Sequence, residues 1–287
     1  MKTIATILAT MMLGTSIAAC NLNVDGSFMG KPIKASDTFV TKEYKVTDFD
    51  KINLVGSGKV FFTQQPGAPA VSVVTSDNVA EILDVYVENN TLCLRIKKGY
   101  SVNYLKKLDY TVNAAALKAM NITGSGDFKL MNGLTTDNLK LSITGSGDMD
   151  CNNVNCSGNM EVSISGSGDI NADNLQSNDL SVSIAGSGDI GLGNISANNV
   201  KANISGSGDI KLKGKTLKAK YSIAGSGDIA ASDLLAEDVI ANTSGSGDIT
   251  CYASTAIEAS RAGSGSIGYK GNPQKVNISK KGVYAIE

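Results

Sequence analysis

Histidine and tryptophan are both absent from this 287-residue chain. Without histidine, the protein lacks the commonest general base, the usual zinc ligand and every Ser-His or Cys-His nucleophile pair. Aromatic residues are few, with six Phe and nine Tyr, so little aromatic surface is available to stack on sugars. Most familiar enzyme chemistry is therefore excluded.

Proline is also scarce, and its placement is informative. All four prolines lie outside residues 121–267, as expected where backbone N–H groups are needed in strand ladders. The chain contains 31 glycines, and its 42% hydrophobic residues are mostly Ile, Leu, Val and Ala. This composition supports a buried core and favours short strands with many turns.

The first residues are typical of an exported protein. Lys2 precedes an apolar run from Ile4 to about Leu13, and Ile17-Ala18-Ala19-Cys20 resembles a bacterial lipobox. An ordinary secretory signal cleaved just before the cysteine is the alternative. The expected order is a lipoprotein signal peptide over residues 1–19, then a lipidated Cys20 that attaches the protein to the membrane, with a polar tether over residues 20–41.

A Gly-Ser-Gly triplet recurs along most of the chain at nearly constant intervals. Seven consecutive copies continue with Asp, whereas the first copy has Lys59 and the last has Ser266 at that position. Atypical copies at both ends are typical of the capping units of a repeat protein. The triplets begin at Gly56, Gly124, Gly145, Gly166, Gly186, Gly206, Gly225, Gly245 and Gly263, and the aspartates are Asp127, Asp148, Asp169, Asp189, Asp209, Asp228 and Asp248.

Each repeat has strand periodicity on both sides of its triplet. Leu180, Val182 and Ile184 alternate with polar residues before one copy, and Ile190 to Leu192 repeat the alternation after it. A unit of about 20 residues cannot bury its own apolar face, so the units must stack. The sequence predicts an all-β fold, a parallel β-helix or solenoid with about 20 residues per rung. A β-prism or propeller built from hairpins is the alternative.

The glycines are expected at a tight turn between two strands, with a second corner near Asn174 or Asn194. Before the regular repeats we expect strands without the repeat, joined in one place by a hairpin turn at Asn89-Asn90. The predicted parts are an irregular N-terminal β cap over residues 42–120, the Gly-Ser-Gly-Asp solenoid over residues 121–267, and a C-terminal cap over residues 268–287 that protects the last sheet edge.

Stacked rungs would place the seven aspartates in one column about 5 Å apart. That arrangement costs roughly 3 kcal/mol per neighbouring pair at an effective dielectric of about 20. One interpretation is that each carboxylate accepts hydrogen bonds within its own turn or points into water. The other is a row of calcium sites, because carboxylate, hydroxyl and carbonyl oxygens suit this cation. No other cofactor is expected.

Four cysteines, Cys93, Cys151, Cys156 and Cys251, remain besides Cys20. Cys151 and Cys251 occupy the same position of the repeat, five rungs apart, too far for a disulfide. Cys151 could bond to Cys156, and the alternative is that both are small buried apolar side chains.

Charge and repetition limit the partners. Residues 121–267 carry nine Lys plus Arg against sixteen Asp plus Glu, which argues against nucleic acid. The lysines between residues 211 and 220 are expected to be a solvated rung edge or to contact an acidic partner. Every rung carries the same Asp, so no differentiated carboxylate pair indicates a polysaccharide-cleaving enzyme. Within the repeats, only Tyr221, Tyr252 and Tyr269 are available to bind a glycan, and Tyr221 has a core phase.

The sequence resembles the bacterial head GIN domain proteins, described as putative autotransporter adhesins, many of them lipoproteins. The resemblance rests on the lipobox, the segment Phe49–Gly58, the strand Asn90–Leu94 and the reiterated Gly-Ser-Gly-Asp-Ile, and it covers residues 42–287. It implies a β-helical fold and an envelope location, and it supplies no catalytic residue.

We therefore expect a lipid-anchored, non-catalytic adhesin or surface-display scaffold of the bacterial outer membrane, facing the periplasm or the cell surface. Its partner is expected to be an envelope component, a host surface or a glycan. A calcium-binding or glycan-binding solenoid is the alternative, with a carboxylate-dependent polysaccharide-cleaving enzyme behind it.

Overall fold

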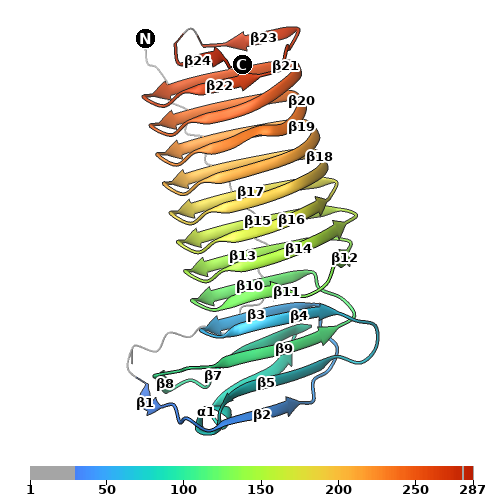
Figure 1. Cartoon of the computed structure of the whole chain (residues 1–287), viewed down its shortest axis with the longest axis vertical. Coiled ribbons are helices and arrows are strands. Elements are labelled where there is room, and N and C mark those ends of the chain that lie inside the picture. The colour runs from blue at the N-terminus through green and yellow to red at the C-terminus, as the bar shows by residue number, and fades with distance from the viewer. Residues whose placement is uncertain (1–29, 280, 287) are drawn as a thin grey trace, which may run out of the picture.

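The protein is a long stack of strands that coil around one hydrophobic core (Figure 1). The structure is a computed structural model that describes residues 30–279 and 281–286. Within the stack, each strand pairs in parallel with its counterpart one repeat later, as Leu180 pairs with Val200. Parallel pairing across a whole repeat confirms the predicted solenoid and excludes the hairpin-based prism or propeller.

One rung has three sides, as the segment from β17 (Asp179–Gly186) into β18 (Ile190–Gly206) illustrates. The first side is β17, the second begins at Ile190 after the glycine turn, and the third follows Asn194. Asn194 has a φ of 43°, a left-handed conformation that asparagine tolerates better than most residues. The corner predicted near Asn174 or Asn194 is confirmed. A third corner lies at Asn198, where the buried and exposed alternation breaks.

Inward side chains of successive rungs form columns that fill the core. Val162 pairs with Val182 and Val182 with Ala202, and all three are fully buried. Tyr221 fits into the same column because Ala202 on one side and Ala241 on the other leave room for its ring. Each rung thus buries its apolar face against its neighbours. Burial of apolar surface stabilises the folded state by about 25 cal/mol per Å².

The regular rungs follow one another in sequence and in space. Their strands lengthen toward the C-terminal end, because the second side, the third side and the next first side merge into one continuous strand. They are β10 (Ala119–Gly124), β11 (Asp127–Leu130), β12 (Leu134–Thr136), β13 (Leu139–Gly145), β14 (Met149–Cys156), β15 (Asn159–Gly166), β16 (Ile170–Gln176), β17, β18, β19 (Ile210–Gly225), β20 (Ile229–Gly245) and β21 (Ile249–Gly263).

The N-terminal part departs from sequential stacking. The rung made of β3 (Lys51–Gly56) and β4 (Lys59–Gln64) pairs on one side with β10 and β11. On its other side it pairs with β7 (Thr91–Ile96) and β9 (Leu108–Ala114). The chain therefore forms an inner rung first, adds an outer one, and returns to continue the stack. The first Gly-Ser-Gly belongs to the same body, as predicted.

Antiparallel strands close the N-terminal end. β2 (Phe39–Tyr44) pairs with β5 (Ala70–Ser76), which also pairs with β9. β6 (Leu83–Glu88) and β7 form a hairpin whose turn residues Asn89 and Asn90 have φ angles of 50° and 59°. Two positive φ angles in succession are typical of a type I′ turn, which confirms the predicted hairpin.

The folded body begins before residue 41, where the tether was expected to end. β1 (Lys31–Lys34) pairs with β8 (Tyr100–Asn103), and β2 starts at Phe39. The polar Lys-Pro-Ile-Lys sequence of β1 has no strand periodicity, and its proline is tolerated because β1 lies at a sheet edge. The tether prediction is therefore wrong for residues 31–41. The predicted signal peptide and Cys20 lie outside the described residues.

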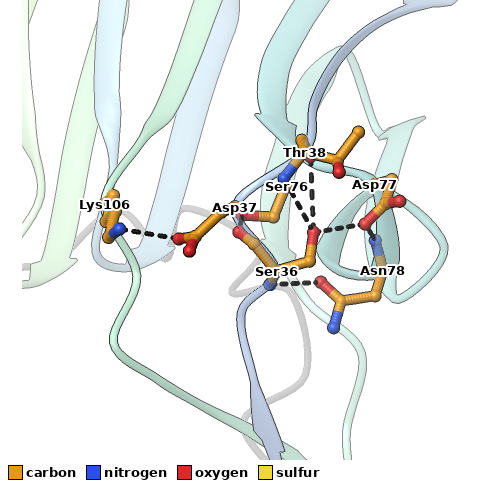
Figure 2. A network of polar contacts seen from close by, with 7 residues as sticks. All are labelled: Ser36, Asp37, Thr38, Ser76, Asp77, Asn78 and Lys106. Atoms are coloured by element: carbon orange, nitrogen blue, oxygen red, sulfur yellow. Dashed lines mark hydrogen bonds and ion pairs between the residues drawn. The ribbon is translucent and has the colours of Figure 1, made fainter.

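A polar network holds the loop between β1 and β2 (Figure 2). The Ser36 hydroxyl donates to the Asp77 carboxylate, and the Ser36 N–H donates to Oδ1 of Asn78 at 3.0 Å. Lys106 Nζ lies 2.6 Å from Oδ1 of Asp37. The Ser36 hydroxyl and the Asn78 N–H lower the pKa of Asp77, and Lys106 lowers the pKa of Asp37. The segment where the chain enters the body is thus fixed from two sides.

The C-terminal cap extends the last rung. β22 (Ile267–Lys270) pairs with β21, β23 (Lys275–Ile278) pairs with β21, and β24 (Val283–Ala285) pairs with β22. β23 and β24 lie within the C-terminal cap that was predicted over residues 268–287. The described residues contain one helix, α1 (Asp77–Ala80), and none that is long and apolar enough to cross a membrane.

Candidate functional site

The Gly-Ser-Gly-Asp turns stack in one column and join the first side of each rung to the second. Gly186 has a φ of 143°, and a Cβ there would lie 2.1 Å from the carbonyl oxygen of Gly166. At Gly188 a Cβ would lie 2.0 Å from the carbonyl oxygen of Gly168. The first glycine is needed for its conformation, and both are needed for the close approach of the turns. All seven predicted turn glycines have positive φ: Gly124, Gly145, Gly166, Gly186, Gly206, Gly225 and Gly245.

The aspartates form a hydrogen-bonded ladder between rungs. Oδ1 of Asp189 accepts from the N–H of Asp209 at 2.8 Å. The expected bonds within one turn are therefore wrong, because each hydrogen bond that an Oδ1 of this ladder accepts comes from the next rung. The ladder runs through Asp127, Asp148, Asp169, Asp189, Asp209, Asp228 and Asp248, at N–O distances from 2.7 to 3.4 Å.

The backbone explains why the carboxylate is used in this way. The Ser187 N–H donates to the carbonyl of Gly166 in the preceding rung, whereas the Ile190 N–H donates to the carbonyl of Asp209 in the following one. Within the turn, the backbone N–H groups therefore switch from acceptors in the preceding rung to acceptors in the following rung. The Asp N–H lies at this change, and the carboxylate of the preceding rung supplies its acceptor.

The two atypical copies of the motif cap this ladder. Lys59 Nζ lies 2.9 Å from Oδ2 of Asp127, and that carboxylate raises the pKa of Lys59. At the other end, Ser266 donates its N–H and its hydroxyl to Oδ1 of Asp248, at 2.6 and 3.0 Å. Capping rungs at both ends of the stack were predicted from these two copies. They cap the aspartate ladder but not the stack, because β7 and β9 pair with the outer side of the Lys59 rung and β24 pairs with β22 beyond the Ser266 turn. The prediction that they are terminal rungs is therefore wrong.

The ladder geometry bears on the calcium interpretation. Calcium takes about six to eight oxygen ligands, whereas each rung contributes a single carboxylate whose Oδ1 already accepts an N–H. In the described part of the chain, no three Asp, Glu or Cys side chains are grouped closely enough to hold a metal ion. The aspartates act here as acceptors that join successive turns.

Asparagine ladders at the other two corners were not predicted. Asn194 donates its amide to Oδ1 of Asn174 at 2.8 Å, and Asn174 donates to Oδ1 of Asn153 at 2.6 Å. At the third corner, Asn198 donates to Oδ1 of Asn178 at 2.7 Å. These asparagines recur in the sequence at about the interval of the repeat, and this recurrence could have predicted the ladders.

The lysine-rich rung faces solvent. Lys213 Nζ lies 3.4 Å from Oδ2 of Asp233 in the next rung, and Lys218 stacks in register with Asp238. Acidic residues of one rung thus offset the lysines of its neighbour, as expected for a solvated edge. The exposed lysines are Lys211, Lys213, Lys215, Lys218 and Lys220.

The tyrosines of the repeats differ in exposure, whereas the cysteines are all buried. Tyr221 is fully buried, which raises its pKa and removes it as a glycan platform, whereas Tyr252 and Tyr269 are partly exposed. Cys151, Cys156 and Cys251 are buried free thiols. The possible Cys151–Cys156 disulfide is therefore wrong, and the alternative of small buried side chains is confirmed.

Comparison with protein families matched residues 48–173 and 159–273 to a family described as "Putative auto-transporter adhesin, head GIN domain". The chain belongs to this family. The two segments overlap within the repeats and together span the irregular rungs and the whole ladder. Membership indicates an adhesin-like protein of the cell envelope or surface, as the motif resemblance implied.

Solved structures show the same fold. A "putative lipid binding protein" from Parabacteroides distasonis is 27% identical, with a TM-score of 0.67 over 90% of this chain and 100% of that one. A "putative adhesin" from Parabacteroides merdae is 22% identical, with a TM-score of 0.70 over 89% and 99%. A "putative adhesin" from P. distasonis is 23% identical, with a TM-score of 0.68 over the same shares. Comparison with curated proteins found no match.

Proposed function

We propose that the protein is a lipid-anchored, non-catalytic adhesin or display scaffold of the bacterial outer membrane, held by a lipid on Cys20. The observation behind the proposal is that the two ends of the stack differ. The described chain enters at β1 and β2, beside the N-terminal rungs, and successive rungs lead away to the C-terminal cap (Figure 1).

The geometry supports an end-on display. Gly30 is ten positions after Cys20, a reach of at most about 35 Å. The nine Gly-Ser-Gly copies between Gly56 and Gly263 span eight rung intervals, about 38 Å. An anchor on Cys20 therefore holds the irregular rungs, where the described chain enters the body, within about 35 Å of the membrane, and the last rungs lie about 38 Å farther along the stack. The network around Ser36 keeps the point of entry rigid relative to the stack.

Several observations support a binding role over a catalytic one. The aspartates are equivalent from rung to rung and serve backbone N–H groups. Catalysis by carboxylates needs two groups with different environments, and the ladder supplies none. The proposed role requires no cofactor, and the hydrogen-bonded ladder does not need calcium.

Adhesion of whole bacteria tests this function. A strain expressing the full-length chain is compared with one expressing Cys20→Ala, for attachment to a cultured epithelial layer and for clumping of the cells. We expect the wild-type chain to raise one or both, and Cys20→Ala to remove the increase because the protein is no longer held at the cell. Equal attachment with and without the wild-type chain, at confirmed surface levels, would contradict an adhesive role.

A further inference from the structure

A groove follows the third side of the solenoid and the corner after it, across the rungs from β14 to β21. Its volume is about 670 Å³. Six rungs line it, which at about 4.8 Å per rung gives a length near 24 Å along the axis. The floor is made of small side chains in register, Ala197, Thr216 and Ala236, and their size leaves the surface hollow between taller walls.

One half of the groove is lined by neutral polar groups. Gln176 and Ser196 stack in register on one wall, and Asn178 and Asn198 form their amide ladder on the other. Amides and hydroxyls both donate and accept hydrogen bonds, and sugar hydroxyls need both. On the floor, the buried Ser177 hydroxyl has no hydrogen-bond partner among the described residues.

The other half of the groove exposes large apolar side chains beside its two charged residues, Lys215 and Glu237. Leu217 and Leu235 are 48% and 53% exposed, and Tyr252 stacks in register beyond Leu235. In the column of Leu235 and Tyr252, the two preceding rungs carry Ser196 and Lys215. Large apolar side chains thus replace polar ones in adjoining rungs at one end of the groove. These side chains offer an apolar contact next to polar groups, and an amphipathic ring such as that of Tyr252 can face the apolar face of a sugar.

The groove is also close to neutral. Its charged lining residues are Lys215 and Glu237, which cancel, and neither forms an ion pair with another described residue. A neutral lining does not suit nucleic acid or a polyanion. We propose that this groove binds a neutral glycan chain lying along the solenoid axis. The inference rests on the proposed adhesive function and names its ligand class and site.

Isothermal titration of the full-length protein in detergent tests the site, with cellohexaose, mannohexaose and chitohexaose as probes. Two variants alter the groove, Tyr252→Ala and Leu235→Asp. Two matched controls alter exposed residues elsewhere, Tyr284→Ala at 50% exposure and Ile240→Asp at 40%. We expect saturable binding of at least one probe, a loss of tenfold or more in both groove variants, and unchanged affinity in both controls. Unchanged melting curves establish that the variants fold.

Three results would overturn the inference. The wild-type protein binds none of the probes; the groove variants bind as tightly as the controls; or the protein binds phosphatidylethanolamine vesicles but no sugar, and Leu235→Asp removes that binding, which assigns the groove to lipid. Each leaves the adhesive function to be decided by cell attachment. Conversely, oligosaccharide binding in the groove without cell attachment would contradict the adhesive function while the site stands.

Discussion

The N–H of Asp209 donates to Oδ1 of Asp189 across the boundary between two rungs, at 2.8 Å. The contact solves two problems that stacking creates. Backbone N–H groups before the Asp donate to the preceding rung and those after it donate to the following rung, so the Asp N–H needs an acceptor, which the carboxylate supplies. The same contact places an N–H dipole next to each carboxylate of a column of like charges. The motif is therefore a means of joining rungs, which leaves binding to other surfaces.

Replacing one aspartate of the ladder separates its charge from its role as an acceptor. Asp189→Asn keeps an Oδ1 acceptor and removes a charge, so we expect a free energy of unfolding within about 0.5 kcal/mol of wild type. Asp189→Ala removes the acceptor for the Asp209 N–H, and we expect a loss of about 1 kcal/mol, because water reaches this exposed turn. Urea unfolding of both variants measures the difference. Equal loss in both would show that the negative charge itself is needed.

Calcium should not stabilise the protein. The ladder carboxylates accept N–H groups from neighbouring rungs, so thermal unfolding should give the same melting temperature with calcium and with chelator. Direct titration by calorimetry should show no binding heat. A rise of several degrees with calcium, with several bound ions, would make the column a metal ladder instead.

Two glycines of the same motif position test the packing of the turns. Alanine at Gly186 would place Cβ 2.1 Å from a carbonyl oxygen, whereas at Gly56, which also has positive φ, nothing lies within 4 Å of the new atom. We expect Gly186→Ala to cost about 3 kcal/mol or more and Gly56→Ala about 1 to 2 kcal/mol, from conformation alone. Chemical denaturation compares them, and similar losses would argue against the close stacking.

The buried thiols predict a loss of stability at alkaline pH. Burial raises the pKa of Cys151, with a smaller contribution from Asp150, and that of Cys251, each from 9.0 to about 12. The unfolded chain then releases these protons first, so their contribution is complete below about pH 9 and is lost as the pH rises toward 12. Between about pH 9 and pH 10 the free energy of unfolding should fall by about 1 kcal/mol per thiol.

A double variant, Cys151→Ala with Cys251→Ala, checks the source of this pH dependence. Its unfolding free energy should fall less steeply over the same range, although the buried phenols of Tyr110 and Tyr221, whose pKa values burial also raises, add to the slope above about pH 10. An identical slope in the variant and the wild type would assign the effect to other groups.

Tyr221 offers a stabilising substitution. Its ring fills the space between Ala202 and Ala241, but its buried hydroxyl has no hydrogen-bond partner within the described chain. Tyr221→Phe keeps the ring and removes the unsatisfied group, so the free energy of unfolding should rise by about 1 kcal/mol. Tyr221→Ala is the control, with an expected loss of about 3 to 5 kcal/mol from the cavity. Destabilisation by phenylalanine would reveal a partner for the hydroxyl.

Much of the fold could be predicted because the same pattern of apolar residues and turn glycines occurs in every repeat. The alternation around Val182 and the turn at Gly186 both follow from residue type and position. The rung made of β3 and β4 lies between two neighbours, the rung made of β7 and β9 on one side and the regular rungs on the other. This position could not be predicted, because periodicity indicates strands but not the order in which they stack.

The candidate site was less predictable. The direction of the aspartate bonds depends on which rung each N–H faces, and only the register settles this. The groove was missed because its signal is the absence of a polar residue at Leu217 and at Leu235, which looks like ordinary variation between two neighbouring repeats. Strand β1 was missed because Lys31–Lys34 pairs through its backbone and shows no apolar pattern.

Labelling growing cells with radioactive palmitate, followed by separation of membrane and soluble fractions, tests whether the solenoid is held at the envelope through Cys20. Wild type is compared with Cys20→Ser, and Cys251→Ser, a buried cysteine, is the control. We expect labelled, membrane-bound protein for wild type and for Cys251→Ser, and unlabelled, soluble protein for Cys20→Ser. Unlabelled wild-type protein in the soluble fraction would contradict a lipid anchor on Cys20.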